Sequence, residues 1–222
     1  MEVALKRGGA VHGGLFLAAV CAAALVSPPL PWPWYLLLPL LAYGGVALLF
    51  APLRRTAPVI GIGRMGGAPL GCAAILIAGT TAVLVVFHAW ACPDVTELAG
   101  HIPVAVFGNL LLAGIIFSIL NAALEEVVFR GVLWGAIAQE WNNGVALVVT
   151  AIFFGIGHIH GYPPGSVGAV LAGIYGLALG LLRWWTGGLG LALGCHLCAD
   201  ATIFGLLWWS GAFAPTLGEL DR

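Results

Sequence analysis

Eight apolar segments follow one another along the chain with short polar breaks between them, and this pattern limits the fold more than any other feature. A helix needs about 20 apolar residues to cross the hydrocarbon core of a bilayer. A chain of 222 residues that is divided in this way has no room for a soluble domain. The pattern therefore predicts an all-α polytopic membrane protein, a bundle of about eight transmembrane or re-entrant helices. The segments cover residues 10–27, 33–50, 69–92, 103–124, 127–141, 144–160, 166–185 and 188–209.

The charge content excludes the other classes of protein. Charged residues make up 8% of the chain, against roughly 25% in an ordinary soluble domain, so a soluble enzyme would lack the polar surface that it needs. A hydrophobic share of 61% excludes a disordered chain. A formal net charge of −1 provides no basic surface for a nucleic acid. We therefore expect the lipid bilayer as a partner and no nucleic acid.

The cations predict which side of the membrane each loop occupies. Cytoplasmic loops carry an excess of Lys and Arg, and the loop 93–103 contains neither. We therefore expect the N-terminus and the loop 51–68 in the cytoplasm and the loop 93–103 outside. The Ala-, Gly- and Trp-rich composition favours the inner membrane of a bacterium. The cations on which the orientation rests are Lys6, Arg7, Arg54, Arg55 and Arg64.

Residues 61–66, Gly-Ile-Gly-Arg-Met-Gly, match the G-x-G-x-x-G pattern of dinucleotide-binding sites. That pattern binds a nucleotide when it follows a strand and opens a helix within a βαβ unit. Here it lies between two apolar segments instead. We therefore expect no nucleotide site at these glycines.

Few ionisable residues lie within the apolar segments, and these are the candidate functional residues. A charged side chain in the middle of a membrane costs roughly 3 kcal/mol or more, so such residues usually face a site or a partner. The candidates are Glu125, Glu126, Arg130, His158, His160, His196 and Asp200, with Glu140 at a segment edge.

Several candidates are four residues apart, which places them on one face of a helix. Glu126 and Arg130 can neutralise each other, either as a structural ion pair or as part of a site. Glu125 lies about 100° further round the helix and is left free to face elsewhere. His196 and Asp200 form a second pair, in which the carboxylate could orient the imidazole.

Each candidate also has a purely structural interpretation. A single histidine within a membrane segment, such as His158 one turn after Phe154, can be a hydrogen-bonded packing residue. We expect His160, beside the Gly-Tyr-Pro-Pro turn, at the membrane interface, and Glu140 at the end of a helix. The structural interpretation weakens because all the pairs occur in one small chain and because it does not account for Glu125.

Together these motifs resemble the signature of the CPBP (Abi) family, the CAAX prenyl protease 2 and bacteriocin-processing intramembrane proteases. The third motif of that family usually ends in Asn, and Asp200 is a variant of it. The resemblance covers about residues 103–209 and implies an all-helical bundle of roughly eight spans. The matching motifs, in order, are Glu125-Glu126-x-x-x-Arg130, Phe154-x-x-x-His158 and His196-x-x-x-Asp200.

The resemblance implies that three of these side chains act on the substrate. Glu125 would be the general base that activates water, and His158 and His196 would position that water or stabilise the oxyanion. Two histidines and a carboxylate are also a plausible zinc-binding set. Because the chain has no H-E-x-x-H motif, we expect no required cofactor, with zinc at these three residues as the alternative.

The other motif residues would support these three. Asp200 would orient a histidine, and the pair of Glu126 and Arg130 would hold the geometry of the site. We expect the chain to divide into accessory transmembrane helices (1–102), a catalytic helical core (103–209) and a short tail (210–222).

Geometry constrains how the segments between the motifs run. If 103–124 and 127–141 formed one span, the next span would carry His158 to the opposite side of the membrane from Glu125. We therefore expect 127–141 to be a short return pass or re-entrant helix, so that the site converges in the cytoplasmic half. This arrangement gives eight membrane segments with both termini inside, and it leaves Arg183 outside as an exception to the charge rule.

These observations predict an intramembrane endopeptidase that hydrolyses a peptide bond of a membrane-associated protein or peptide through a glutamate-activated water. Prenylated CAAX tails, bacteriocin leaders and C-terminal sorting or processing tags are all substrates compatible with the resemblance. The alternative is a non-catalytic membrane protein, either a proton-coupled transporter or a bacteriocin-immunity scaffold. Transporters are often built from two related halves, and we find no similarity between 1–102 and 103–222.

Overall fold

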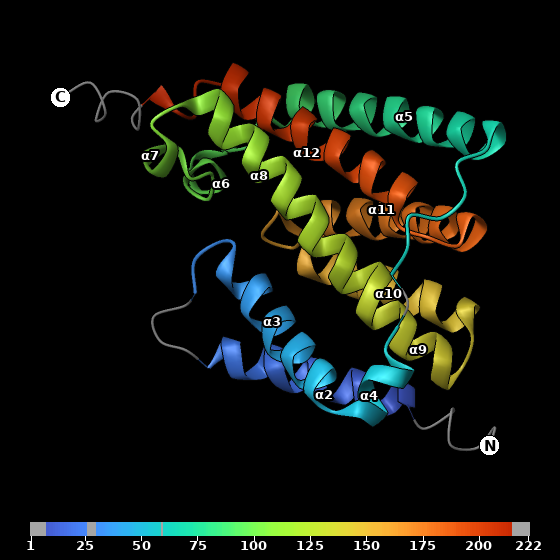
Figure 1. Ribbon diagram of the computed structural model, residues 1–222. Helices are drawn as coiled ribbons and strands as arrows, with labels where there is room; N and C mark the ends of the chain where they lie inside the picture. Colours follow the sequence, from blue (N-terminus) through green and yellow to red (C-terminus); the bar gives the residue numbers. More distant parts are fainter. Residues whose placement is uncertain (1–7, 26–29, 59, 215–222) are drawn as a thin grey trace.

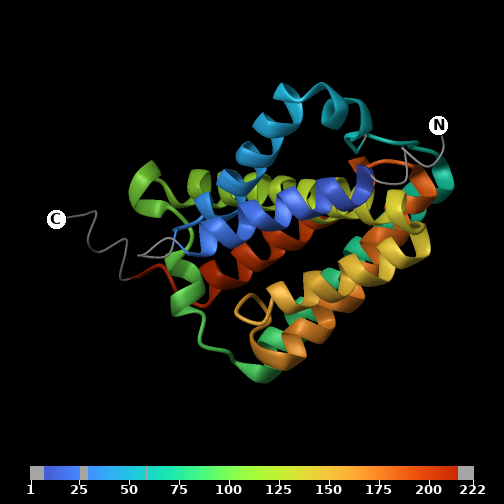
Figure 2. The same cartoon turned by 90° about the horizontal axis from the view of Figure 1, so that it is seen from below.

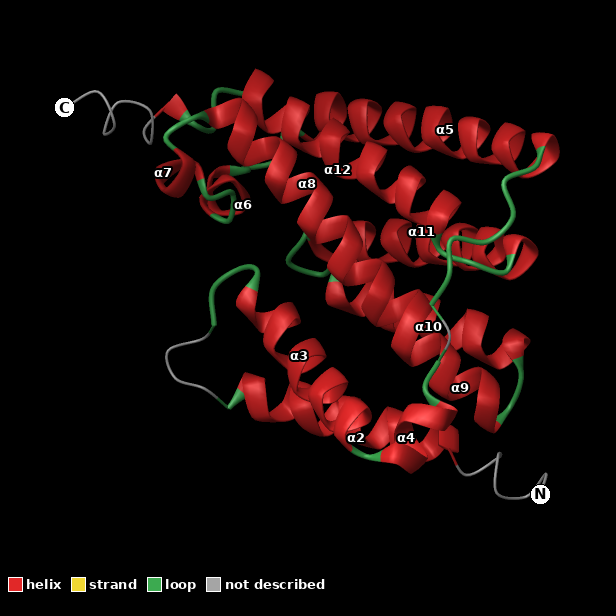
Figure 3. Ribbon diagram, in the orientation of Figure 1, coloured by secondary structure: helices red, strands yellow, loops and turns green. Residues whose placement is uncertain are grey.

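The computed structural model describes residues 8–25, 30–58 and 60–214, and every regular element in these ranges is a helix (Figure 3). The all-α prediction is therefore confirmed. The elements in chain order are α2 (Gly8–Ala24), α3 (Trp34–Leu49), α4 (Ala51–Thr56), α5 (Gly67–Ala91), α6 (Thr96–Gly100), α7 (Val104–Phe107), α8 (Leu110–Glu126), η1 (Val127–Leu133), α9 (Trp134–Glu140), α10 (Asn143–Gly157), α11 (Gly165–Thr186) and α12 (Gly190–Trp209).

The helices differ in their capacity to cross a bilayer. Four are long and apolar enough to do so: α5, α11, α12 and the continuous helix Leu110–Glu140. Three further apolar helices, α2, α3 and α10, have 17, 16 and 15 residues and are shorter than a full span. The protein is an integral multi-pass membrane protein.

The predicted return pass at 127–141 is wrong, because α8, η1 and α9 form one helix of 31 residues. Its middle turn, η1, is a π-helix in which N–H groups bond carbonyls five residues back. Thus the Trp134 N–H bonds the Phe129 and Gly131 carbonyls. The Arg130 carbonyl, its partner in an α-helix, accepts a hydrogen bond from Arg183 Nε. The chain passes from α8 to α9 without reversing.

His158 reaches Glu125 without a return pass because α9 and α10 form an antiparallel hairpin. The turn of this hairpin lies at residues 141–142, and residues equally far before and after it lie at the same level. Glu125 and His158 satisfy this condition. The error in the prediction was to place Glu125 at the end of a span, whereas it lies in the middle of a long helix.

The helices end at two opposite ends of the bundle, which we call the inner and the outer end (Figures 1 and 2). The inner end holds the starts of α2 and α5, with α4, the end of α9 and the turn 187–189. The outer end holds α6, α7 and the ends of α5 and α12. Residues 8 and 214, the first and last that the structure describes, lie at opposite ends. The expectation that α12 runs inward to a cytoplasmic C-terminus is therefore wrong for the described chain.

This topology removes the exception to the charge rule. Arg183 lies near the end of α11, which together with the start of α12 forms part of the inner end. Arg64 lies there as well, because its guanidinium donates to the Trp185 carbonyl at 2.9 Å. Arg54 and Arg55 belong to α4 at the same end. We therefore expect the inner end to lie on the cytoplasmic side.

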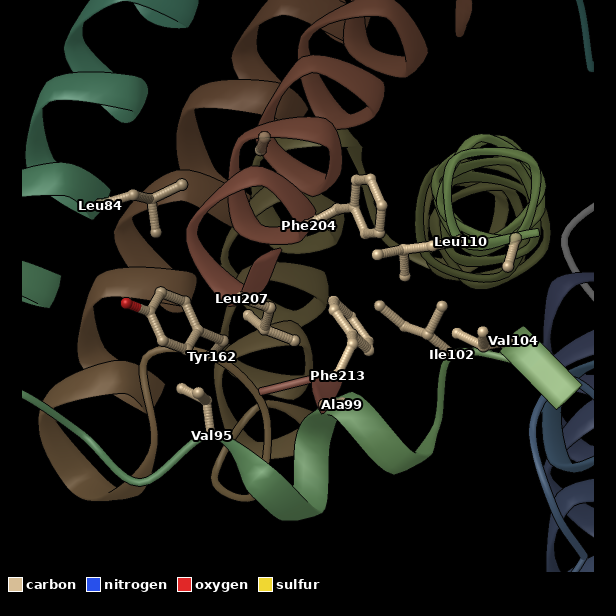
Figure 4. Close-up of a cluster of buried hydrophobic side chains, with 12 residues drawn as sticks. Leu84, Val95, Ala99, Ile102, Val104, Leu110, Tyr162, Phe204, Leu207 and Phe213 are labelled. Carbon is tan, nitrogen blue, oxygen red and sulfur yellow. The ribbon is translucent and has the colours of Figure 1, made fainter. Parts of the chain in front are cut away.

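A cluster of buried apolar side chains holds the outer end together (Figure 4). Phe204 and Leu207 of α12 and Phe213 pack against Ala99 and Ile102, which come from α6 and the residues after it. The short helix α6 is thus held over the outer end by apolar contact.

Residues 60–66 form a strap across the inner end, and this strap explains the glycine motif. Two strap carbonyls accept hydrogen bonds from the α11–α12 turn, Gly61 O from Leu189 N at 2.7 Å and Ile62 O from Gly190 N at 2.8 Å. Gly63 has φ +83°, and a Cβ on it would overlap the Gly188 backbone. The glycine is needed for backbone packing, which agrees with the expectation that no nucleotide binds here.

The topology predicts the thiol reactivity of single cysteines in a cysteine-free variant of the protein. Gly100→Cys and Ala214→Cys, at the outer end, should react with a membrane-impermeant maleimide in intact cells. Gly61→Cys, on the strap, should react only after permeabilisation. All three sites are exposed, so a difference reports the side of the membrane. Protection of Ala214→Cys in intact cells would contradict an α12 that runs from the inner end to the outer end.

Candidate active site

The structure brings together the six ionisable residues of the three motifs near the middle of the bundle. Glu125 and Glu126 come from the end of α8, Arg130 from η1, and His158 from the residue after α10. His196 and Asp200 come from α12. Five of the six are buried, and His158 is partly exposed.

Arg130 and Glu126 form a fully buried ion pair, each with 1% of its surface exposed. Arg130 Nη1 donates to Glu126 Oε1 at 2.8 Å, and Nη2 donates to the Gly176 carbonyl at 3.1 Å. The guanidinium also lies 4.3 Å from the centre of the Phe154 ring, an arrangement typical of cation–π contacts. The charge is therefore compensated by a carboxylate on its own helix and by groups of α10 and α11.

His196 is oriented by Glu126. Its Nδ1 lies 2.8 Å from Glu126 Oε1, and a carboxylate that is paired with Arg130 can only accept a hydrogen bond. Nδ1 therefore carries the proton, and Nε2 faces Glu125 Oε2 at 3.7 Å. The contact fixes both the ring orientation and the tautomer of the neutral imidazole.

His158 is oriented in the same way by a backbone carbonyl. Its Nδ1 lies 2.7 Å from the Phe154 oxygen, and because a carbonyl only accepts, Nδ1 must be the donor. Its Nε2 then faces Glu125 Oε2 at 3.6 Å. Two imidazole Nε2 atoms thus converge on one carboxylate oxygen, at distances too long for direct hydrogen bonds.

Asn121 completes the site, although the sequence analysis did not select it. Its amide nitrogen donates to Glu125 Oε1 and to Asp200 Oδ2, both at 3.2 Å. Its oxygen accepts from Trp32 Nε1 at 3.2 Å. The signal in the sequence was an amide inside an apolar run, one helical turn before Glu125.

Asp200 touches Asn121 more closely than it touches His196. Its Oδ1 lies 3.8 Å from His196 Nε2, beyond hydrogen-bond distance, whereas its Oδ2 accepts from Asn121. Glu126, rather than Asp200, therefore orients His196. Asp200 is connected to Glu125 through the amide of Asn121.

The two peripheral candidates lie away from this cluster. Glu140 Oε2 accepts from the Ala10 N–H at 3.3 Å, which ties α9 to the start of α2 at the inner end. His160 lies in the turn between α10 and α11 and lines the cavity described next.

Glu125, His158 and His196 line a cavity of about 680 Å³. Apart from the cluster its wall is largely apolar, which is typical of ligand-binding sites. Residues of α5 and of the α2–α3 connection, including Trp32, contribute to this wall. The predicted division at residue 103 remains a prediction, and the part expected to be accessory supplies one side of the cavity.

The described residues include no group of three or more His, Cys, Asp or Glu side chains that could hold a metal ion. The alternative set of Glu125, His158 and His196 has both imidazole Nε2 atoms directed at the carboxylate, but it is not arranged as a metal-binding group.

Comparison with known proteins supports the resemblance drawn from the motifs. Residues 107–202 match the family described as Type II CAAX prenyl endopeptidase Rce1-like. No curated protein and no solved structure matches the chain. The matched segment contains all six motif residues together with Asn121, and Trp32 and α5 lie outside it. The suspected relationship is thereby confirmed, since the segment that carries the motifs is similar to the Rce1-like family of type II CAAX prenyl endopeptidases.

Proposed function

We propose that this protein is an intramembrane endopeptidase in which Glu125 activates the attacking water. The observation that carries the proposal is the state of Glu125 Oε2, a buried carboxylate oxygen that has no hydrogen-bond partner among the described residues and belongs to a side chain lining the cavity. Glu126 Oε2 is also without a partner, but Glu126 does not line the cavity. Glu125 Oε2 also faces two imidazoles. Leaving such a group unpaired costs about 1–3 kcal/mol or more, which is typical of a group kept free for a reaction.

The reaction needs a proton donor beside Glu125, and the net charge of the cluster bears on which group can act as that donor. Glu125, Glu126 and Asp200 face a single buried guanidinium, that of Arg130, so the cluster would carry a charge of about −2 if both histidines were neutral. Such a charge attracts positive charge to the cluster, including that of an imidazolium. A protonated imidazole at Glu125 can donate a hydrogen bond to a developing oxyanion.

The proposed reaction follows from these positions. A water held by Glu125 Oε2 loses a proton to the carboxylate while its oxygen attacks the scissile carbonyl carbon. The oxyanion that forms accepts hydrogen bonds from an imidazolium Nε2–H of His158 or His196. The C–N bond then breaks, and the proton held by Glu125 passes to the leaving amine. Asn121 keeps Glu125 in place through its contact with Oε1.

The proposed substrate is a membrane-associated protein or peptide in the inner membrane of a bacterium. The name of the family refers to prenylated CAAX tails, and substrates with a C-terminal sorting or processing tag are also consistent with an apolar cavity. The non-catalytic alternative of a proton-coupled transporter fits less well, because a transporter gives its site access from both sides. Here an apolar cluster of α5, α11 and α12 side chains fills the space between His196 and the inner end.

Glu125→Gln should abolish peptide hydrolysis while the protein remains folded. Glutamine keeps an oxygen that can accept from Asn121 but is not a base, so we expect at least a hundredfold loss of activity. The measurement is cleavage of quenched fluorogenic peptides, prenylated CAAX and unprenylated apolar, by purified protein of verified thermal stability. Glu97→Gln, the same change at an exposed position of α6, serves as the control. Retention of a tenth of the wild-type rate would remove Glu125 from the role of base.

We further propose that the reaction requires no metal. Protein treated with a strong chelator should keep its full rate of peptide cleavage, and elemental analysis should find well under one zinc per chain. The support is the arrangement of the donor groups, since the described residues contain no metal-binding set. Stoichiometric zinc whose removal stops cleavage and whose return restores it would reassign Glu125, His158 and His196 as ligands.

Substitutions of Asp200 separate a positioning role from a need for its charge. In Asp200→Asn the amide oxygen can still accept from Asn121, so cleavage should stay within about tenfold of wild type. In Asp200→Leu the Asn121 N–H loses its acceptor, and we expect a considerably larger loss. The rates are compared at matched amounts of folded protein. An equal and severe loss in both variants would show that the carboxylate charge itself is required.

A further inference from the structure

We propose that the substrate enters the site from the outer end of the bundle. We propose further that this substrate is an apolar, uncharged segment of an exported protein held in the outer half of the membrane. This inference rests on the proposed peptidase function and specifies the substrate class and the side from which it arrives. Three features of the molecule support it: the direction in which the cavity extends, the layers that close the opposite end, and the chemistry of the lining.

The cavity extends from the cluster toward the outer end. On α5 its wall runs over residues 75–84, about 14 Å of helix, and a Thr81–Thr202 contact sets this stretch beside the outer half of α12. Leu98, His101 and Ile102, in α6 and just after it, line the cavity where it reaches the outer end. Of the described residues, none from α2, α4, α9 or the first eight positions of α5 contributes to the wall.

The inner end is closed by two layers. The first is the apolar cluster in which Ala73 of α5 packs with Leu179, Leu191 and Cys195, directly on the inner side of His196. The second is the strap 60–66, hydrogen-bonded to the α11–α12 turn. Side chains there leave no room for a peptide, since Cβ atoms on Gly188 or Gly190 would already collide with the strap. The route along the bundle from the inner end to the cluster is therefore closed.

The lining selects against anionic ligands. Glu125 and Asp200 are its carboxylates, both in the cluster, and among the described residues it contains no Lys or Arg. Apart from its histidines the lining offers no cationic group to a phosphate or a free carboxylate, and its two carboxylates repel such anions. Most of the remaining wall is aliphatic or aromatic, so an extended apolar stretch of peptide is the ligand that it suits.

The experiment compares two valines on one helix. Val83 lines the cavity, whereas Val85 points away from it, although the two are equally exposed at 48% and 45%. Each is changed to cysteine in a cysteine-free variant and treated in intact cells with a membrane-impermeant, positively charged methanethiosulfonate. We expect Val83→Cys to react at least tenfold faster than Val85→Cys, because only the former faces a water-accessible cavity. Gly61→Cys on the strap should stay unreactive until the cells are permeabilised.

Two peptides then test the substrate class. An uncharged peptide of alternating Leu and Ala, with blocked ends, should slow the modification of Val83→Cys at least threefold. The same peptide with two Leu replaced by Glu should not slow it. Equal protection by both peptides, or by neither, would contradict the proposed selectivity.

Every other outcome of the labelling also decides the question. Reaction of Val83→Cys only after permeabilisation would show entry from the cytoplasm, and reaction no faster than Val85→Cys would show that no aqueous cavity exists there. Because labelling needs no catalysis, the result should be the same in a Glu125→Gln background. A failure of the peptidase function would appear instead as no cleavage by the wild-type protein, with the labelling pattern intact.

Discussion

The site depends on one buried charge, the guanidinium of Arg130. It binds Glu126 on its own helix, the Gly176 carbonyl of α11 and the ring of Phe154 on α10, and through Glu126 it fixes His196 of α12. Four helices thus meet at a single side chain. Breaking a buried ion pair typically costs about 3–5 kcal/mol, because the partner is left charged and unpaired. The ion pair of Glu126 and Arg130 therefore has more than a structural role. It also determines the tautomer of His196, which faces Glu125.

Local spacing was sufficient to predict the members of the site, and insufficient to predict how the chain connects them. Residues four apart share a helix face whatever the tertiary structure, so Glu126 with Arg130 could be paired from the sequence. The return pass failed because it rested on a wrong estimate of where a span begins and ends. Only Glu125 and Glu126, and no proline, lie between 103–124 and 127–141. The π-helical turn that follows leaves no mark in the apolar pattern, and the carbonyl that it frees is bonded by Arg183 from another helix.

Contacts between helices could not be predicted from the sequence for the same reason. Asn121 binds one acid on its own helix and one 79 residues away, and its oxygen is held by Trp32. An apolar segment with a single amide does not indicate which of its neighbours will carry the matching groups. The role of the N-terminal helices was underestimated in the same way, because a cavity wall on α5 has the composition of any lipid-facing surface.

The unequal lengths of the helices have a consequence for the surrounding lipid. The helices α2 and α3 are about 25 Å long, whereas Leu110–Glu140 is about 46 Å long. A bilayer with a hydrocarbon core of about 30 Å must thin beside the short hairpin, while the long helix tilts or projects beyond it. Hydrophobic mismatch thus lowers the headgroup region on one flank of the protein, near Trp32. On that flank a peptide anchored among the headgroups has fewer residues to thread through hydrocarbon before its backbone reaches Glu125.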